Sequence, residues 1–253
     1  MDDHLKALVL GGSGSLGAEV CRVLAKHNVD IVFTYHHGKE NADRLVKALS
    51  SQGIFIESLS LDLHDMTNVR EVVQASHEKL GGIDSLIIAS GIATGHFSDG
   101  MPVVPDFFDI TPEMYDDMMS VNVRGIFFTL QEVARIMTVS QKGRIVIVGS
   151  IDGIKLLPSP VDYACCKAAL WGMCQSLAKE LGKYNILVNM VAPGILEGGI
   201  AELLSAELMQ EYLKHCSLKR VGTFSEIANM IVFLAGPKNT YLTGHAIVLD
   251  GGL

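Results

Sequence analysis

The chain has 253 residues, of which 49% are hydrophobic and 19% are charged, and its formal net charge is −8. This composition excludes a disordered or coiled-coil protein, and the negative charge argues against nucleic acid as the main partner, because phosphate binding needs clustered Lys and Arg. No apolar run is long enough to span a bilayer, no signal peptide is visible, and the five cysteines lack metal-ligand spacing. We therefore expect a cytoplasmic protein with reduced thiols, no metal site and no membrane partner.

Short apolar runs alternate with longer helical stretches from one end of the chain to the other. The runs that suit buried parallel strands are Ala7–Leu10, Asp30–Thr34, Phe55–Leu59, Ser85–Ala89, Arg144–Val148, Ile186–Val191 and Ala246–Leu249. The predicted helices are Leu16–His27, Lys39–Gln52, Met66–Leu80, Thr111–Thr138, Val161–Tyr184 and Ser225–Ala235. This alternation predicts an α/β fold in one domain, residues 1–253, with a doubly wound parallel sheet of about seven strands and helices on both faces.

Two long connections interrupt the alternation. Ala93–Ile110 follows the fourth strand, and Gly194–Val221 follows the sixth and has the pattern of two short helices. Both are predicted at the carboxyl edge of the sheet, where open α/β sheets bind their ligands. We expect residues 194–221 to form the substrate loop.

A glycine-rich turn, Gly11–Gly17, joins the first strand directly to the first helix. Glycines allow the backbone to turn sharply and to approach a pyrophosphate, whose charge is favoured at the positive end of the helix. The turn therefore indicates a dinucleotide site, although a merely tight connection has a similar pattern.

No acidic residue ends the second strand, which runs into Thr34, Tyr35 and His36. A carboxylate there would bind the adenosine ribose of NAD and repel an added phosphate, so its absence favours NADP(H) over NAD(H), with these three residues near the 2′-phosphate. Asp62 follows the third strand and is predicted either to bind the adenine amino group or to cap a helix.

The third feature is a Ser–Tyr–Lys set. Tyr163 and Lys167 are four residues apart on a predicted helix and so share one face, and Ser150 lies thirteen residues before Tyr163. An ammonium near a phenol is expected to lower the pKa of the phenol, which then donates a proton to a carbonyl oxygen at neutral pH. Ser150 is a donor to the same oxygen.

Together these motifs resemble the short-chain dehydrogenase/reductase family over essentially the whole chain. Asn122, Ala192-Pro193-Gly194, Tyr241–Gly244 and Asp250–Gly252 also fit that pattern. The arrangement is most similar to the 3-oxoacyl-[acyl-carrier-protein] reductase-like branch, which implies NADPH-dependent ketone reduction in fatty acid or polyketide metabolism by a homotetramer.

The resemblance also implies residue roles. Tyr163 would be the general acid, Lys167 would lower its pKa and hold the nicotinamide ribose, and Ser150 would bind the substrate oxygen. Asn122 would kink its helix and hold a water in a proton relay to Lys167. The predicted cofactor-binding residues are Gly11, Ser13, Gly14, Ser15, Leu16, Gly17, Thr34, Tyr35, His36, Asp62, Leu63, Ser90, Gly91, Tyr163, Lys167, Pro193, Gly194 and Leu196.

Three departures from the family pattern affect cofactor binding more than chemistry. Ser15 replaces the middle glycine of the usual turn, so Gly14 is expected to take over its role. Ile88-Ala89-Ser90-Gly91 replaces an Asn-Asn-Ala-Gly segment, and Gly198 replaces a Thr that binds the nicotinamide carboxamide in many relatives.

The leading hypothesis is an NADPH-dependent reductase of an apolar or acyl-type ketone. The alternatives are an NAD-linked alcohol dehydrogenase of the same family and a non-catalytic nucleotide-binding regulator. An acyl thioester substrate held on an acyl carrier protein would need a basic rim, because such carriers are acidic. The cations considered for that rim are Lys142, Lys183, Lys214, Lys219 and Arg220.

Overall fold

The computed structural model describes residues 4–92, 97–98, 101–102, 105–156, 159–198, 201 and 204–253. Its main sheet has seven strands in the order β3-β2-β1-β4-β7-β8-β9, and every neighbouring pair is parallel. The strands are β1 (Lys6–Leu10), β2 (Asp30–Tyr35), β3 (Ile56–Ser60), β4 (Ser85–Ile88), β7 (Gly143–Val148), β8 (Ile186–Pro193) and β9 (Ala246–Leu249). These are the seven predicted runs, with ends shifted by a residue or two, and the predicted fold class is confirmed.

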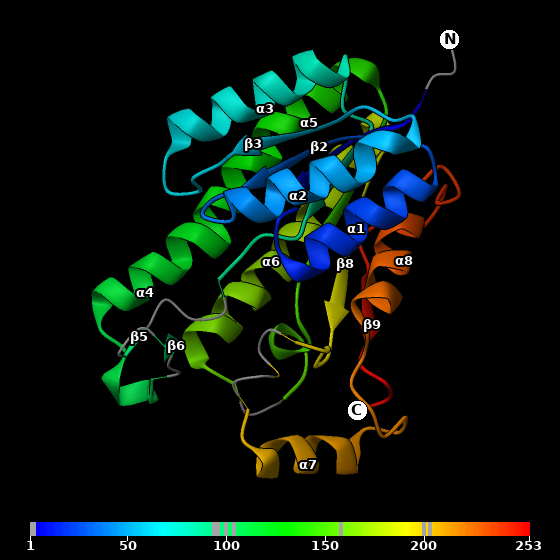
Figure 1. Cartoon of the computed structure of the whole chain (residues 1–253). Helices are drawn as coiled ribbons and strands as arrows, with labels where there is room; N and C mark the ends of the chain where they lie inside the picture. Colours follow the sequence, from blue (N-terminus) through cyan, green and yellow to red (C-terminus); the bar gives the residue numbers. More distant parts are fainter. Residues whose placement is uncertain are drawn as a thin grey trace.

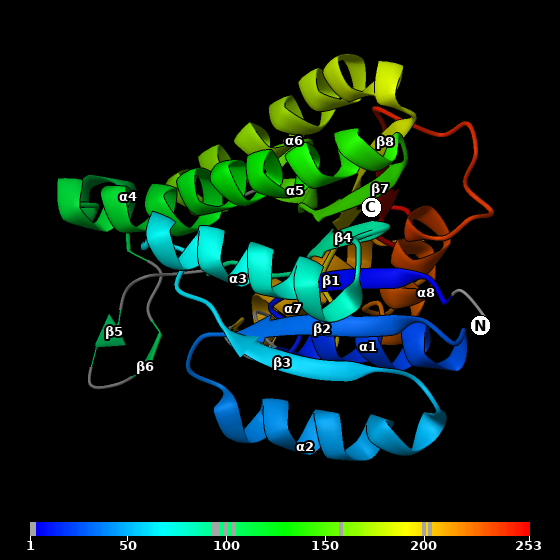
Figure 2. The ribbon, with the colours of Figure 1, turned by 90° about the horizontal axis from the view of Figure 1, so that it is seen from above.

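Helices cover both faces of this sheet (Figure 2). One face carries α1 (Ser15–Lys26), α2 (Lys39–Leu49) and α8 (Phe224–Ala235), and the other carries α3 (Met66–Leu80), α5 (Ile126–Ser140) and α6 (Val161–Leu181). Strand β1 shows why both are needed. Ala7 and Val9 pack into the core under α1 and α8, whereas Leu8 and Leu10 pack into the core under α3, α5 and α6.

The predicted helix Thr111–Thr138 is divided into three parts. Helix α4 (Pro112–Met119) begins at Thr111, whose hydroxyl accepts from the Met114 N–H at 3.3 Å. A π-helical segment, η3 (Ser120–Gly125), follows and leads into α5. A π turn contains one more residue than an α turn, and such turns often lie at functional sites. Shorter 3₁₀ segments, η1 (Ser50–Gln52) and η5 (Gly182–Tyr184), end two other predicted helices.

The carboxyl ends of the strands point toward α7 (Ala206–His215), which lies apart from the sheet (Figure 1). The strand order reverses between β1 and β4, and ligands of open α/β sheets bind at such a switch point. Within residues 194–221, where two short helices were predicted, α7 is the α-helix that the structure describes, and residues 199–200 and 202–203 lie outside the described residues.

The connection after β4 is described only in part. It contains a short antiparallel pair, β5 (Phe97–Ser98) and β6 (Met101–Pro102), and a 3₁₀ segment, η2 (Phe107–Asp109). In the described part of the chain, no helix combines the length and apolar character needed to cross a membrane. The five cysteines are unpaired, and four of them are buried.

Candidate active site

The turn between β1 and α1 has a shape that requires glycine. Gly11 has a φ of +76°, and a Cβ on Gly17 would lie 2.2 Å from the Gly11 carbonyl oxygen. A Cβ on Gly12 would lie 2.6 Å from the side chain of Phe33. Gly14, by contrast, is an exposed N-cap with ordinary extended backbone, so it does not take over a conformational role from Ser15.

The N-terminus of α1 suits a pyrophosphate. No side chain caps this helix, and no acidic residue lies in its first turn, so N–H groups remain available to an anion. Gly11, Gly12 and Gly17 bring the backbone close together behind this helix end. The residues present therefore fit the dinucleotide that the sequence predicts.

The residues after β2 take different positions. Thr34 is buried, and its hydroxyl accepts a 3.1 Å hydrogen bond from the Gly11 N–H, so it holds the turn. Tyr35 is half-buried and His36 is exposed, and the ring of His36 lies against that of His37 with centroids 3.7 Å apart. The side chain of Ser13 lies beside Gly38, where an added Cβ would be 3.0 Å from Oγ. Of the three predicted neighbours of the 2′-phosphate, Tyr35 and His36 are therefore the accessible ones.

Asp62 is not a helix cap. Asp65 caps α3, because its carboxylate accepts from the N–H groups of Thr67 and Asn68. Asp62 accepts from the His64 N–H at 2.9 Å, and this hydrogen bond is the main reason that the pKa of the Asp62 carboxyl is lowered. It also lies 4.0 Å from the His36 ring nitrogen. The neighbouring Leu63, also predicted at the cofactor, is buried.

The segment after β4 connects the glycine turn to η3. Ser90 lies against Gly11, and within the described chain its buried hydroxyl has no hydrogen-bond partner. An unpaired buried hydroxyl calls for an explanation, and a bound cofactor at this position would supply a partner. Gly91 follows, and a Cβ there would lie 2.6 Å from the Asn122 side-chain oxygen.

Asn122 lies in the π-helical segment and is fully buried. Its side-chain oxygen accepts from the Ile92 N–H at 3.1 Å, and its amide nitrogen donates to the carbonyls of Ile92 and Met118 at 3.1 and 3.2 Å. The predicted distortion of the helix at Asn122 is therefore present as a π turn. The same amide also fixes the segment after β4, which is a structural role.

Ser150, Tyr163 and Lys167 meet in one cavity of about 810 Å³. Ser150 follows β7, and Tyr163 and Lys167 lie on α6, with the lysine nitrogen 5.3 Å from the centre of the Tyr163 ring. Leu16 from the glycine turn and Pro193, Gly194 and Leu196 from the end of β8 line the same cavity. It thus extends from the proposed phosphate turn to the phenol.

The pKa of Tyr163 differs from the value expected from the sequence. Burial lowers the pKa of Lys167 to about 8. Burial also raises the pKa of Tyr163, the charge of Asp152 raises it further, and the hydrogen bond with Ser150 opposes this rise. The expected lowering by Lys167 was wrong for the cavity as it stands, because desolvation of the phenolate is the larger effect. At neutral pH the phenol is protonated.

Asp152 is a cavity residue that the sequence analysis missed. The Ser150 hydroxyl donates to its Oδ2 at 2.6 Å, and the Asp152 N–H donates back to the serine oxygen at 3.3 Å. A single Asp four residues after the end of β7 belongs to no periodic pattern, so only its proximity to Ser150 could have indicated it. Tyr212 of α7 also lines the cavity, and its hydroxyl accepts from the Ile195 N–H at 3.1 Å.

Comparison with known proteins identifies the family. Residues 11–253 match a family model described as enoyl-(acyl carrier protein) reductase. The chain is 33% identical over 246 residues to the 3-oxoacyl-[acyl-carrier-protein] reductase FabG of Thermotoga maritima, covering 97% of this chain and 96% of that protein. The chain belongs to the short-chain dehydrogenase/reductase family.

Solved structures of this family superpose closely on the chain. A short-chain dehydrogenase from Burkholderia cenocepacia in complex with NADP has a TM-score of 0.87 at 29% identity, with 98% of this chain and 97% of that chain covered. A blue fluorescent protein from a metagenomic library in complex with NADPH has a TM-score of 0.86 at 30% identity, with 100% and 99% covered. The protein is accordingly an NAD(P)-dependent oxidoreductase of the short-chain family.

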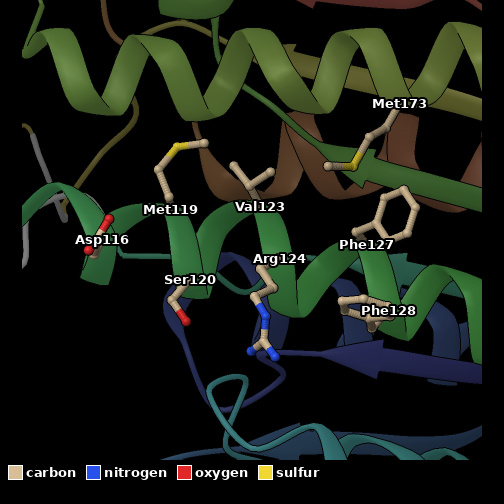
Figure 3. Close-up of a pocket in the computed structure, with 8 residues that line it drawn as sticks. All are labelled: Asp116, Met119, Ser120, Val123, Arg124, Phe127, Phe128 and Met173. Carbon is tan, nitrogen blue, oxygen red and sulfur yellow. The ribbon is translucent and has the colours of Figure 1, made fainter.

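A second, shallower pocket of about 510 Å³ lies on the outer side of η3, α5 and α6 (Figure 3). Phe127, Val123 and Met119 face Met173 across it, and the Arg124 guanidinium lies 5.8 Å from the Phe128 ring centre. It has none of the paired acid–base groups of the main cavity. Its lining is mostly apolar, as in a protein contact surface.

Proposed function

We propose that this short-chain dehydrogenase/reductase reduces a ketone to a secondary alcohol with NADPH, and that Tyr163 is the general acid. The observation that carries this proposal is the single cavity that holds a protonated phenol, a buried ammonium and a glycine turn suited to a dinucleotide. A bound nicotinamide would supply the hydride that reduces the carbonyl carbon.

Side chains of the protein donate the proton that the substrate oxygen receives and then replace it. Tyr163 donates its phenolic hydrogen to the substrate oxygen as negative charge develops there. Lys167, which is largely protonated at pH 7 with a pKa of about 8, stabilises the phenolate that remains. Gly91 leaves room between Lys167 and Asn122, since a Cβ on Gly91 would lie 3.7 Å from the lysine nitrogen and 2.6 Å from the amide oxygen. We assign Asn122 the water of the relay that returns a proton to Tyr163 through Lys167.

Four features support a preference for NADPH. The end of β2 lacks a carboxylate, His36 is exposed there, Ser13 and Gly38 form the adjoining wall, and α2 begins at Lys39 without a side-chain cap. Together they provide donors and positive potential for a 2′-phosphate. The bound NADP and NADPH of the two structural relatives agree with this choice.

For the substrate we propose a free small ketone ahead of a carrier-bound acyl thioester. Four cations of the supposed basic rim form ion pairs with carboxylates: Lys142 with Asp84, Lys183 with Glu180, Lys214 with Glu211, and Arg220 with Glu226. Lys219 donates to the Lys214 carbonyl. This compensation weakens attraction for an acidic carrier. The relative's name, 3-oxoacyl-[acyl-carrier-protein] reductase, keeps the acyl thioester as the second candidate.

We also propose that copies of the chain associate through the shallow pocket, as in a homotetramer, and that the protein works in the cytoplasm. Phe127 is 45% exposed on this apolar surface, which a second copy would cover. Met118 and Ile126 are fully buried within one copy and belong to its core. Sedimentation of Phe127→Asp tests this: a smaller assembly than the wild type supports the contact, and an unchanged assembly refutes it.

A ketone panel tests the proposed activity. Wild-type protein should oxidise NADPH in the presence of at least one small ketone. It should use NADPH more efficiently than NADH. Faster turnover with NADH, together with oxidation of secondary alcohols, would favour an NAD-linked alcohol dehydrogenase. Tight binding of either nucleotide without turnover of any carbonyl would favour a regulator.

A further inference from the structure

Asp152 places a carboxylate on the wall of the main cavity, directly beside Ser150, the residue that the family resemblance assigns to the substrate oxygen. Its Oδ2 accepts the Ser150 hydroxyl hydrogen at 2.6 Å. Among the described residues, no other side-chain hydrogen bond to this carboxylate is present, and Asp152 lines the cavity. We take Oδ1 as the acceptor that is free for a ligand. Ser150 is thereby held with its hydrogen toward Asp152.

The charge of Asp152 has no ion-pair partner in the described part of the chain. Lys155, three residues further on, is bound to Asp250 and to the Leu253 carbonyl. Lys167 is directed to the ring of Tyr163 on the next helix. The other cavity carboxylate, Glu211, is in contact with both His215 and Lys214. Asp152 therefore differs from Glu211 in having no ion pair within the described chain, although its charge partly offsets the lowering of the nearby Lys167 pKa by burial, and in lying beside the reacting groups.

We propose that Asp152 determines substrate specificity by selecting ketones that carry a hydroxyl, or another hydrogen-bond donor, on the carbon next to the carbonyl. This inference rests on the proposed function. When the substrate oxygen accepts the Tyr163 hydrogen, a carbon next to the carbonyl can lie beside the carboxylate that holds the Ser150 hydroxyl. A donor on that carbon satisfies Oδ1 with a charge-assisted hydrogen bond, whereas an apolar group leaves Oδ1 desolvated and unpaired. A carboxylate in the same place would be repelled.

Two ketones of nearly equal shape isolate this effect. In 3-hydroxybutan-2-one a hydroxyl occupies the place of one methyl group of 3-methylbutan-2-one. With NADPH, kcat/KM of the wild type should be about 10- to 100-fold higher for the hydroxyketone, the range expected for one hydrogen bond to a charged group. In Asp152→Ala the ratio should fall to near one. In Glu211→Gln, which alters the compensated carboxylate of the same cavity, the ratio should stay at the wild-type value.

A variant that gains activity distinguishes a specific effect of Asp152 from poor folding, which would only lower activity. Asp152→Asn keeps the shape and an acceptor for Ser150 but removes the charge, so it should raise kcat/KM for 2-oxobutanoate, which has a carboxylate beside the carbonyl, by about tenfold. If the wild type reduced the two matched ketones with equal kcat/KM, or if Asp152→Ala left their kcat/KM ratio unchanged, the role of Asp152 would be overturned while the proposed function would stand. Failure of the wild type to reduce any ketone with either nucleotide would overturn the proposed function and this inference with it.

Discussion

Replacing Gly17 with alanine tests whether the turn after β1 holds the cofactor. The new Cβ would lie 2.2 Å from the Gly11 carbonyl oxygen and 2.9 Å from the Gly12 Cα, both of which are backbone atoms that no rotamer change can move. Normal contact distances are about 3.5 Å, so the turn has to open by about 1 Å. The first turn of α1 and the N–H groups beside it then lose their alignment.

Two effects of known size follow. Overpacking of this kind costs about 1–3 kcal/mol of folding free energy. Misplacing one turn N–H that binds a phosphate oxygen costs about 1.5–3 kcal/mol, which corresponds to a Kd for NADPH raised about 10- to 100-fold. Nucleotide fluorescence titration measures the Kd, and urea unfolding measures the free energy of unfolding.

Gly182→Ala is the matched control. Gly182 is exposed, its φ is −56°, and no atom outside its own helical turn lies within 4 Å of an added Cβ. This substitution should leave the Kd unchanged and stabilise the fold by about 0.4–1 kcal/mol, because it reduces the freedom of the unfolded chain. If Gly17→Ala bound NADPH as tightly as the control, the turn would not be the phosphate site.

Three further substitutions give separate expectations. The pKa of Lys167 is about 8 in the folded protein and 10.5 ordinarily. Between pH 8 and pH 10.5 only the unfolded chain therefore keeps this proton, so the stability of the wild type rises with pH over that interval. Lys167→Met should therefore be inactive but up to about 3 kcal/mol more stable than the wild type at pH 7. Urea unfolding should show this gain in stability shrinking toward pH 10.5. If the variant is no more stable at pH 7, Lys167 does not carry a buried charge. Asn122→Ala strands the N–H and carbonyl of Ile92 and should lower the unfolding free energy by about 2–4 kcal/mol, whereas a loss below about 0.5 kcal/mol contradicts the bonds described. His36→Asp should raise the NADPH-to-NADH ratio of Kd values at least about tenfold, and an unchanged ratio would place the 2′-phosphate elsewhere.

The regular part of the fold could be predicted because most strands are short apolar runs, and the central ones are buried on both faces. Such runs show their ends directly, as Ala246–Leu249 does without any shift. The division of Thr111–Thr138 could not be predicted, since one extra residue in a π turn barely changes the spacing of apolar side chains. The antiparallel β5–β6 pair was also missed, because two-residue strands carry no periodic signal.

In the site, the sequence indicated which groups meet but not how their surroundings act on them. Tyr163 and Lys167 share a helix face, as their spacing predicts. The direction of the Tyr163 pKa shift was wrong because desolvation depends on everything packed around the ring. Thr34 is predicted near the 2′-phosphate, and the structure shows in addition that its hydroxyl accepts from the Gly11 N–H. This contact between two strand ends has no signature in the sequence.

The Tyr163→Phe variant tests the central claim most directly, because it removes the phenolic oxygen and keeps the ring. On any ketone that the wild type reduces, kcat should fall by about 10²- to 10⁴-fold, the usual contribution of a general acid, while the Kd for NADPH changes little. A variant that binds NADPH normally and also turns over at a near wild-type rate would show that the proton comes from another group.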